Sequence, residues 1–354
     1  MPDNPRILFI GDLNAYAKGR ARERALKRLG AEVLAYSHTA IGGDDKGHPH
    51  LSLMFRIGWK LGFHLDTEGI NKLLPGAAQS FRPDLVWIEK GNMIRPETLV
   101  AIKRAAPHAM ICAYSEDDMF SPLNRTRAYA QGLGHYDIIF TTKSYNAMPN
   151  ELPTLGARRC VMVDKAFDPD QHRPVMLNDT ERGAYGTDLG FIGSFAPERG
   201  DDVLFLADKG FKLRVWGNGW EGFSGTHQNL AIERRALVNT DTDLRYTKGI
   251  AATKINLGFL RKANRDLQTD RSIEIPACGG FMLAEYSDEH ARLFQDGREA
   301  VFYRDRDELV AKARRYLEND AERQAVALAG RLRCVKSGYS HDERLKFMLS
   351  TALG

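Results

Sequence analysis

The stretch RILFIGD, residues 6–12, is a short apolar run that ends in Gly-Asp, and it is the first of a series. Such runs, rich in β-branched and aromatic residues, are typical of buried strands. Helical segments lie between them at residues 21–29 and 96–106. Alternation of this kind predicts parallel strands joined by right-handed crossovers, which is a Rossmann-like half. The further strands expected in this half are at residues 32–37, 84–89, 110–116, 136–142 and 158–164.

The same alternation begins again beyond residues 166–186, a segment rich in Pro, Asp and Gly that we interpret as a linker. Strands are expected after it at residues 188–194, 212–218, 254–259, 281–286 and 300–303. The sequence therefore predicts an α/β fold of two Rossmann-like, doubly wound domains facing a cleft, at residues 1–165 and 187–335.

Three helices are expected near the C-terminus, at residues 305–317, 320–335 and 345–353. Asn319 is expected to end the first and Asp320 to cap the second. Ser340 and Glu343 have the spacing of a capping box before the third. We expect residues 336–354 to form a helix that packs back on the N-terminal domain.

Composition narrows the class of protein. The chain has 354 residues, of which 43% are hydrophobic and 27% charged, and its net charge is +4. These values are typical of a soluble globular protein, and no Lys/Arg block indicates nucleic-acid binding. The N-terminal MPDNPRILFIGD lacks the basic region and long apolar region of a signal peptide, so none is expected, and no apolar run is long enough to span a membrane. Four scattered cysteines form no C-x-x-C pair, which predicts a cytoplasmic protein without disulfides or zinc: Cys112, Cys160, Cys278 and Cys334.

The segment RSIEIPACGG, which begins at Arg271, is the main candidate for a ligand site. A loop enters a short helix here, and Pro276 and the glycine pair Gly279 and Gly280 end it. The unpaired N–H groups of the helix start, its dipole and Arg271 favour a diphosphate. Glu274 would accept hydrogen bonds from ribose hydroxyls, and the glycines would let the backbone approach a ligand. An ordinary helix start followed by a glycine turn explains the same residues.

Two further turns of the second domain are candidates for donor binding. In FIGSFAPERG, Gly193 and Ser194 leave the first strand and Arg199 follows as a candidate phosphate clamp. A solvated surface arginine is the alternative. In VWGNGW, Gly217 suits backbone contact with a nucleobase, and a plain turn fits equally well.

In the first domain, Gly11 leaves the first strand in a loop suited to a phosphate or sugar. The loop is not a G-x-G-x-x-G motif, so no nicotinamide dinucleotide is expected. The run Ser-Glu-Asp-Asp, which ends at Asp118, follows the fourth strand, and Asp117 is our candidate general base for an acceptor hydroxyl. The alternative is that Asp117 or Asp118 caps a turn.

Two patterns invite a metal interpretation. Asp241 and Asp243 spell a D-x-D motif, but an Asp N-cap for the helical segment 244–252 is the preferred explanation. His48 and His50, with Asp44 and Asp45 nearby, lie in Gly-rich surroundings that favour a loop. We therefore expect no metal. The apolar segment 51–63, which contains Arg56 and Lys60, would rest on a membrane, line an acceptor site or pack on a sheet as a helix.

The run RSIEIPACGGFML, followed by LFQDGREAVFY and DEL, strongly resembles the CgeB-like glycosyltransferases, which are named for a spore maturation protein. FIGSFAPERG, VWGNGW and the stretch from Tyr246 to Leu260 occur in the expected order, so the resemblance covers the C-terminal half. The N-terminal half is similar through YSEDD, YDIIFTTKSYN and the HRP at residues 172–174.

The resemblance implies a GT-B glycosyltransferase fold with the donor nucleotide on the C-terminal domain and usually no metal. It implies no cofactor apart from the cosubstrate, a nucleotide sugar and foremost a UDP-sugar. The acceptor would be a glycan, a lipid-linked molecule or a protein. Glu274 occupies the second place of an E-x7-E pattern whose second Glu contacts the donor ribose, and Asp266 stands where the first Glu would be. The role of Asp266 and the stereochemistry therefore stay open.

Three functions fit this interpretation. The first is transfer of a sugar from a nucleoside-diphosphate sugar to an acceptor hydroxyl. The second is another enzyme on the same fold, a nucleotide-sugar epimerase or a phosphorylase, because fold alone does not give function. The third is a module that binds a nucleotide or sugar without catalysis.

Overall fold

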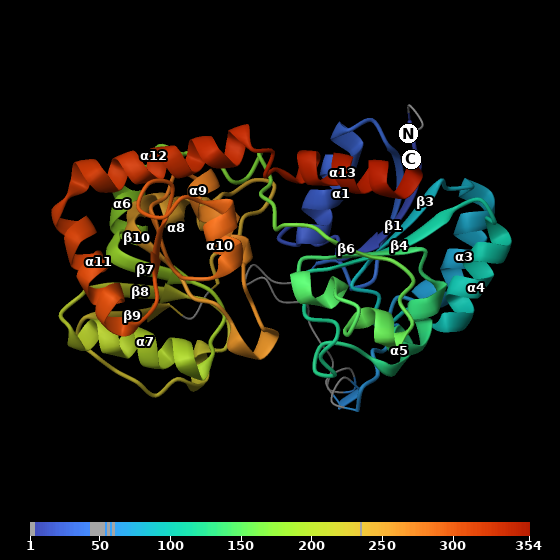
Figure 1. The fold of residues 1–354 in the computed structure, drawn as a ribbon, viewed down its shortest axis with the longest axis horizontal. Helices are drawn as coiled ribbons and strands as arrows, with labels where there is room; N and C mark the ends of the chain where they lie inside the picture. The colour runs from blue at the N-terminus through green and yellow to red at the C-terminus, as the bar shows by residue number, and fades with distance from the viewer. Residues whose placement is uncertain (1–3, 43–53, 55–56, 59–60, 234–235) are drawn as a thin grey trace. The chain divides into compact units, whose positions relative to one another are not determined.

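A computed structural model describes residues 4–42, 54, 57–58, 61–233 and 236–354 of the chain (Figure 1). The chain forms two compact units: unit 1 comprises residues 1–164 and 341–354, and unit 2 comprises residues 165–340. His48 and His50 lie outside the described residues, as does most of the segment 51–63.

Unit 1 is built on a parallel sheet of six strands in the order β2-β1-β3-β4-β5-β6. The strands are β1 (Arg6–Gly11), β2 (Glu32–Ser37), β3 (Leu85–Glu89), β4 (Met110–Ser115), β5 (Ile138–Thr141) and β6 (Cys160–Met162). Its helices are α1 (Lys18–Arg28), α3 (Ile70–Phe81), α4 (Pro96–Ala105), α5 (Arg127–Gly132) and α13 (His341–Leu353), with short 3-10 turns at η1 (Leu133–His135), η2 (Ser144–Ala147) and η3 (Leu152–Leu155).

Helices cover both faces of this sheet. Ile7 and Phe9 of β1 pack in one apolar cluster with residues of α1 and α13, whereas Leu8 and Ile10 pack in another with residues of α3 and α4. Because successive side chains of a strand point to opposite faces, a strand that is apolar throughout must be covered on both sides. The last helix, α13, belongs to unit 1, where it contacts α1 and β4.

Unit 2 repeats the plan with a parallel sheet in the order β12-β11-β10-β7-β8-β9. The strands are β7 (Thr187–Ile192), β8 (Leu213–Trp216), β9 (Leu230–Glu233), β10 (Thr253–Gly258), β11 (Met282–Glu285) and β12 (Val301–Tyr303). The helices are α6 (Asp179–Tyr185), α7 (Pro197–Asp208), α8 (Arg245–Ala252), α9 (Asp270–Ala277), α10 (Asp288–Leu293), α11 (Arg306–Glu318) and α12 (Asp320–Lys336), with 3-10 turns η4 (Trp220–Gly222) and η5 (Lys262–Asn264).

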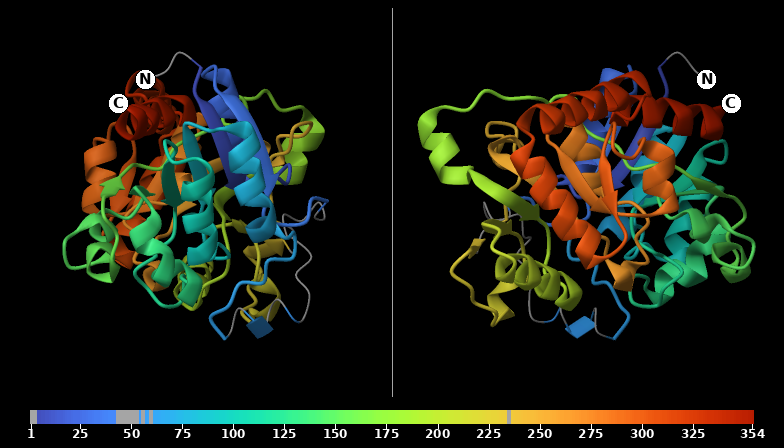
Figure 2. Two further views of the ribbon diagram at one scale, coloured as in Figure 1. Left: turned by 90° about the vertical axis from the view of Figure 1, so that its right-hand side faces the viewer. Right: turned by 60° about the vertical axis from the view of Figure 1, so that its left-hand side comes forward.

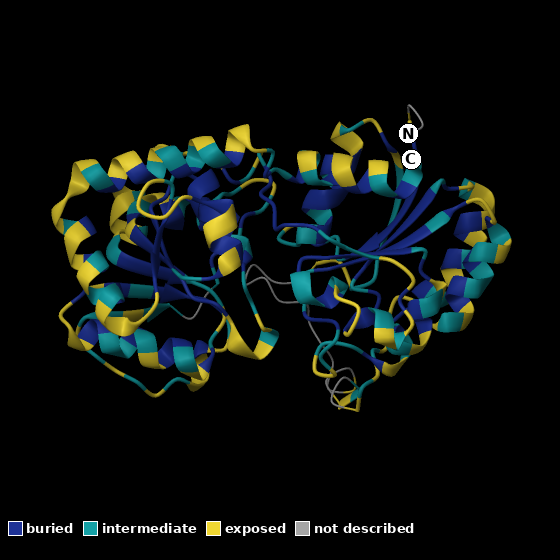
Figure 3. Cartoon of the chain, in the orientation of Figure 1, coloured by how far each residue is buried: buried dark blue, intermediate teal, exposed yellow. Residues whose placement is uncertain are grey.

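The core of unit 2 also lies on two faces of its sheet. Residues of α7 and α11 cover one face with Phe191 and Leu257, and residues of α8 and α9 cover the other with Met282 and Phe302. Helix α11 packs against the sheet, and α12 packs against α9 and α11 (Figure 2). In Figure 3 the strands of each unit are buried, and exposed residues gather on the outer faces of the helices. The predicted pair of Rossmann-like α/β domains is thus confirmed.

Several details of the predicted elements are wrong. Strand β9 was not expected, and the predicted linker contains helix α6, which begins with a capping box between Asn178 and Glu181. Asn319, not Asp320, is the N-cap of α12, since Asp320 already lies in the first helical turn. Every predicted strand is present, with ends that differ by a few residues.

The strand order of unit 2 reverses between β7 and β10. Chain connections run outward from β7 to β8 and β9 on one side, and from β10 to β11 and β12 on the other. In open parallel sheets, ligands bind beyond the carboxyl ends of the strands at such a switch point. The residues that follow Ile192 of β7 and Gly258 of β10 therefore define the place to look for a site.

Candidate functional site

The start of helix α9 is fixed by a buried hydrogen-bond chain. The backbone N–H of Thr269 donates to Ser272 Oγ (2.9 Å), Ser272 Oγ lies 2.6 Å from His290 Nε2, and His290 Nδ1 lies 2.7 Å from the Glu285 carbonyl oxygen. Burial lowers the pKa of His290 to about 4, so the ring is neutral near pH 7. Nδ1–H then donates to the Glu285 carbonyl, and Nε2 accepts the Ser272 hydroxyl proton. Sequence reasoning missed His290 because its partner is 18 residues away.

Arg199 joins the two strand exits at the switch point. Its Nη1 donates to the Ser194 carbonyl oxygen (2.9 Å) beyond β7, and its Nη2 donates to the Phe259 carbonyl oxygen (3.2 Å) beyond β10. The residue is only 3% exposed. The alternative of a solvated surface arginine is therefore wrong.

Arg271 lies near the same aromatic ring, that of Phe191, as Arg199. The Cζ atom of Arg199 is 5.4 Å from the centroid of the Phe191 ring, and that of Arg271 is 5.5 Å from the same centroid. The Nε atoms of both arginines are buried and have no hydrogen-bond partner. Among the described residues neither guanidinium forms an ion pair with a carboxylate.

The electrostatics of this arginine pair favour an anion. Burial, followed by the charge of Arg271, lowers the pKa of Arg199 to about 10. Arg199 stays charged near neutral pH, but its charge is costly to hold beside a like charge. An anion bound beside the two guanidinium groups would relieve that cost. The predicted association of Arg199 and Arg271 with one ligand is therefore physically reasonable.

Asp266 lies near the arginines but holds its own loop. Its carboxylate accepts hydrogen bonds from the Arg261 backbone N–H (3.2 Å) and from Asn264 Nδ2 (2.8 Å). Its charge also raises the pKa of Arg199. The carboxylate thus shapes the turn after β10, η5 included, which gives it a local structural role.

Glu274 is buried on the inner face of α9 and is 6% exposed. Its Oε2 accepts the hydroxyl proton of Tyr246 (2.7 Å), and its Oε1 lies 3.7 Å from His172 Nε2. His172 Nδ1 accepts the Asp168 backbone N–H (3.0 Å), so the ring proton sits on Nε2 and faces Glu274. Sequence reasoning did not pair these residues with Glu274, although both lie in segments that carry the family resemblance. A ribose contact by Glu274 stays a prediction.

Gly279 and Gly280 form the end of α9, opposite to Arg271. Gly279 has φ +79°, and its N–H donates to the Pro276 carbonyl (2.8 Å), while the Gly280 N–H donates to the Ile275 carbonyl (3.0 Å). A Cβ on Gly280 would lie 2.6 Å from Ile250 Cγ2. The helix end explains both glycines. Contact with the ligand stays a prediction for them.

The loops after β7 and β8 are packed against each other. A Cβ on Gly217 would lie 2.0 Å from the Gly193 carbonyl oxygen, so only glycine fits there. The same carbonyl accepts the indole N–H of Trp220 (2.9 Å). Gly193 and Gly217 thus bring the two loops together at the carboxyl edge of the sheet, beside Ser194.

The candidates of unit 1 lie at the carboxyl edge of its own sheet. Gly11 ends β1, where a Cβ would lie 2.9 Å from Glu89 Cγ. Asp117 Oδ2 lies 2.6 Å from the Nζ of Lys90, a residue that follows β3 with φ +58°. Such a conformation is rare for a residue other than glycine. A role for Asp117 as a base stays a prediction.

Asp118 caps a turn, as the alternative interpretation expected. Its Oδ1 accepts the backbone N–H of Phe120 (3.2 Å) and Nδ2 of Asn146 (2.8 Å). The residue is 1% exposed. Asp118 therefore stabilises the turn after β4, as a capping aspartate does.

The D-x-D residues Asp241 and Asp243 neither cap helix α8 nor belong to a group of metal ligands among the described residues. The N-cap of α8 is Leu244, so the predicted Asp cap is wrong. The carboxylate of Asp243 lies instead 3.1 Å from Lys248 Nζ and 3.4 Å from Arg245 Nε. Within the described part of the chain, no three His, Cys, Asp or Glu side chains are grouped as metal ligands would be. The four cysteines are free thiols.

Length and apolarity decide whether a helix can span a membrane. Of the helices in the described ranges, none combines enough residues with enough apolar character to cross a bilayer.

Comparison with known protein sequences gives two findings. A family model described as "Glycosyl transferase-like" matches residues 203–350, a stretch that includes helix α9. No curated protein sequence matches the chain.

Solved structures share the fold of the whole chain. The sucrose-phosphate synthase of Thermosynechococcus elongatus is 11% identical with a TM-score of 0.63, and the match covers 98% of each chain. The Anabaena protein HepE, solved in complex with UDP and glucose, is 11% identical with a TM-score of 0.62 and covers 98% of this chain and 100% of its own. The UDP-GlcNAc 2-epimerase of Neisseria meningitidis, solved with UDP-GlcNAc, is 12% identical with a TM-score of 0.53 over 98% and 99% of the two chains. The chain thus has the fold of GT-B glycosyltransferases.

Proposed function

We propose that this protein is a glycosyltransferase that moves a sugar from a nucleoside-diphosphate sugar, foremost a UDP-sugar, to an acceptor hydroxyl without a metal ion. The observation that carries the proposal is the pair of guanidinium groups of Arg199 and Arg271 beside Phe191, at the switch point of unit 2. Two cations without a carboxylate partner suit a diphosphate better than any neutral ligand.

The comparisons support the same class of ligand. The matched family model covers α9, and two of the structural neighbours were solved with UDP or a UDP-sugar. Each of these neighbours shares no more than 12% of its sequence with this chain, so they support the choice of nucleotide and leave the sugar open.

The proposed roles follow from the chemistry of the reaction. Negative charge develops on the departing diphosphate, and Arg271, Arg199 and the N–H groups at the start of α9 would stabilise it. Glu274, oriented by Tyr246 and His172, would accept hydrogen bonds from the ribose. Gly193, Ser194 and Gly217 would line the donor with their backbone. Asp117 would take the proton of the acceptor hydroxyl.

The test is turnover of UDP-sugars. Full-length protein is incubated with UDP-glucose or UDP-GlcNAc and a panel of glycan, lipid-linked and protein acceptors, with EDTA throughout. Acceptor-dependent release of UDP that EDTA does not reduce is the expected result, together with a rise in melting temperature on adding UDP. A melting temperature unchanged by any nucleoside diphosphate would contradict the proposal.

An epimerase is the second candidate, because UDP-GlcNAc 2-epimerases are among the structural neighbours. Incubation with a UDP-sugar and no acceptor separates the two activities. Conversion of the sugar while UDP stays attached indicates an epimerase. Binding of the donor with neither conversion nor transfer indicates a module without catalysis.

A further inference from the structure

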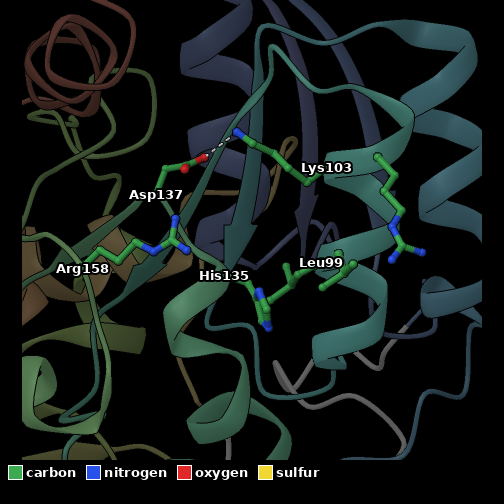
Figure 4. A pocket seen from close by; sticks show the side chains of 7 residues that line it. Leu99, Lys103, His135, Asp137 and Arg158 are labelled. Carbon is green, nitrogen blue, oxygen red and sulfur yellow. Dashed lines mark hydrogen bonds and ion pairs between the residues drawn. The ribbon is translucent and has the colours of Figure 1, made fainter.

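A hollow of about 250 Å³ lies at the amino edge of the unit 1 sheet, opposite to the strand ends that carry Lys90 and Asp117. It is formed by the last turns of α4 and by the residues just before β5 and β6. In Figure 4, His135 lies beside Leu99, the ion pair of Lys103 and Asp137 lies above them, and the Arg158 side chain lies at the left, below Asp137. The complete lining is Leu99, Val100, Lys103, Arg104, His135, Asp137 and Arg158.

The hollow carries an excess of positive charge. Its one carboxylate, Asp137, is already engaged, because Oδ2 accepts from Lys103 Nζ (3.1 Å) and from the Ile111 backbone N–H (2.8 Å). In the described parts of the chain, Arg104 and Arg158 have neither an ion pair nor a side-chain hydrogen bond. Two exposed guanidinium groups therefore border one hollow without a protein anion to balance them.

Stabilisation of a helix end explains only part of this arrangement. Lys103 and Arg104 lie in the last turn of α4, where cations interact favourably with the helix dipole. His135 and Arg158 come from other elements, at η1 and just before β6, and gain nothing from that dipole. Their convergence on the same hollow needs another reason.

We propose that this hollow binds a phosphate ester, with the phosphate held by Arg104, Arg158 and His135 and the apolar part of the ester over Leu99 and Val100. Guanidinium groups match the geometry of phosphate oxygens and can bind them in pairs. The hollow is smaller than a typical pocket for a drug-sized ligand, so it suits a small headgroup. The ester has two possible sources, a soluble metabolite or the headgroup of an anionic phospholipid. The proposed donor site in unit 2 takes no part.

The experiment uses the full chain and two probes. Glycerol 3-phosphate is titrated by calorimetry, and flotation measures binding to phosphatidylcholine vesicles with and without phosphatidic acid. The test variant is the double change Arg104→Glu and Arg158→Glu. The matched control is Arg298→Glu, the same change at an exposed arginine of unit 2. A second variant, Arg158→Gln, removes charge without reversing it, and circular dichroism verifies that all variants are folded.

Wild type and Arg298→Glu are expected to bind at least one probe. The double variant is expected to bind it at least tenfold more weakly, because it reverses two of the charges that would hold the phosphate. Binding of glycerol 3-phosphate identifies a soluble ester, and binding of phosphatidic acid vesicles alone identifies a lipid headgroup. No binding of either probe would overturn the proposal. Equal affinities for the double variant and Arg298→Glu would also overturn it, because the phosphate would then bind elsewhere.

Discussion

Replacing Arg271 with alanine is expected to weaken UDP binding by about 10- to 100-fold, because a hydrogen bond to a charged group contributes roughly 1.5–3 kcal/mol. Arg271 lies in the first turn of α9, and its Nε is buried without a partner. The side chain holds no backbone carbonyl in place, unlike that of Arg199, so its removal should leave the loops intact. Isothermal titration calorimetry with UDP measures the change.

The matched control is Arg298→Ala, an exposed arginine of the same unit. It should bind UDP as the wild type does. Arg271→Lys keeps the charge but not the paired N–H donors, and we expect an intermediate affinity. If Arg271→Ala binds UDP as tightly as Arg298→Ala, the diphosphate is not held at the start of α9.

Replacing Glu89 with alanine is expected to destabilise unit 1 by about 3–5 kcal/mol, the usual effect of leaving one charge of a buried pair alone. Glu89 at the end of β3 binds Arg22 through both oxygens (2.7 and 2.6 Å) and accepts the indole N–H of Trp87 (2.9 Å). Arg22 and Glu89 are 3% and 8% exposed. Burial lowers the pKa of Arg22, but the nearby carboxylates of Glu89 and Glu116 raise it by more. The pKa is therefore raised overall, and the guanidinium stays charged.

Urea unfolding followed by circular dichroism measures this loss. Glu32→Ala is the matched control, because Glu32 also pairs with an arginine, Arg6 (3.1 Å), but on the exposed surface. That change should cost less than about 1 kcal/mol. The double change Arg22→Met and Glu89→Leu removes both charges and should recover much of the stability. A Glu89→Ala variant no less stable than Glu32→Ala would show that the buried pair has little structural importance.

Much of the fold can be predicted from the sequence, because buried parallel strands are apolar on both faces and stand out as continuous runs. Strand β9 escaped prediction because LAIE is a short strand at the edge of the sheet, where none of its residues is fully buried. Helix α6 was not predicted for a related reason. None of its residues is buried, so it has no apolar period, although Asn178 and Glu181 carry the signature of a capping box.

The candidate site was predictable only in part. The position of Arg271 and Glu274 on a short helix follows from local pattern, and α9 spans Asp270–Ala277. The partners of these residues are set by tertiary structure, since Phe191 lies 80 positions before Arg271 and Tyr246 lies 28 before Glu274. A cap also depends on where the helix begins. Asp243 looks like an N-cap but lies one residue too early for that role.

Hydrogen exchange with and without UDP, followed by mass spectrometry, is the most direct test of the proposed donor site. Bound ligand should slow exchange of backbone N–H groups that it contacts or orders. We predict slower exchange with UDP in peptides that cover residues 192–200 and 268–274, the exit of β7 with the start of α7 and the start of α9. Slower exchange confined to peptides of unit 1 would contradict a donor site at Arg199 and Arg271.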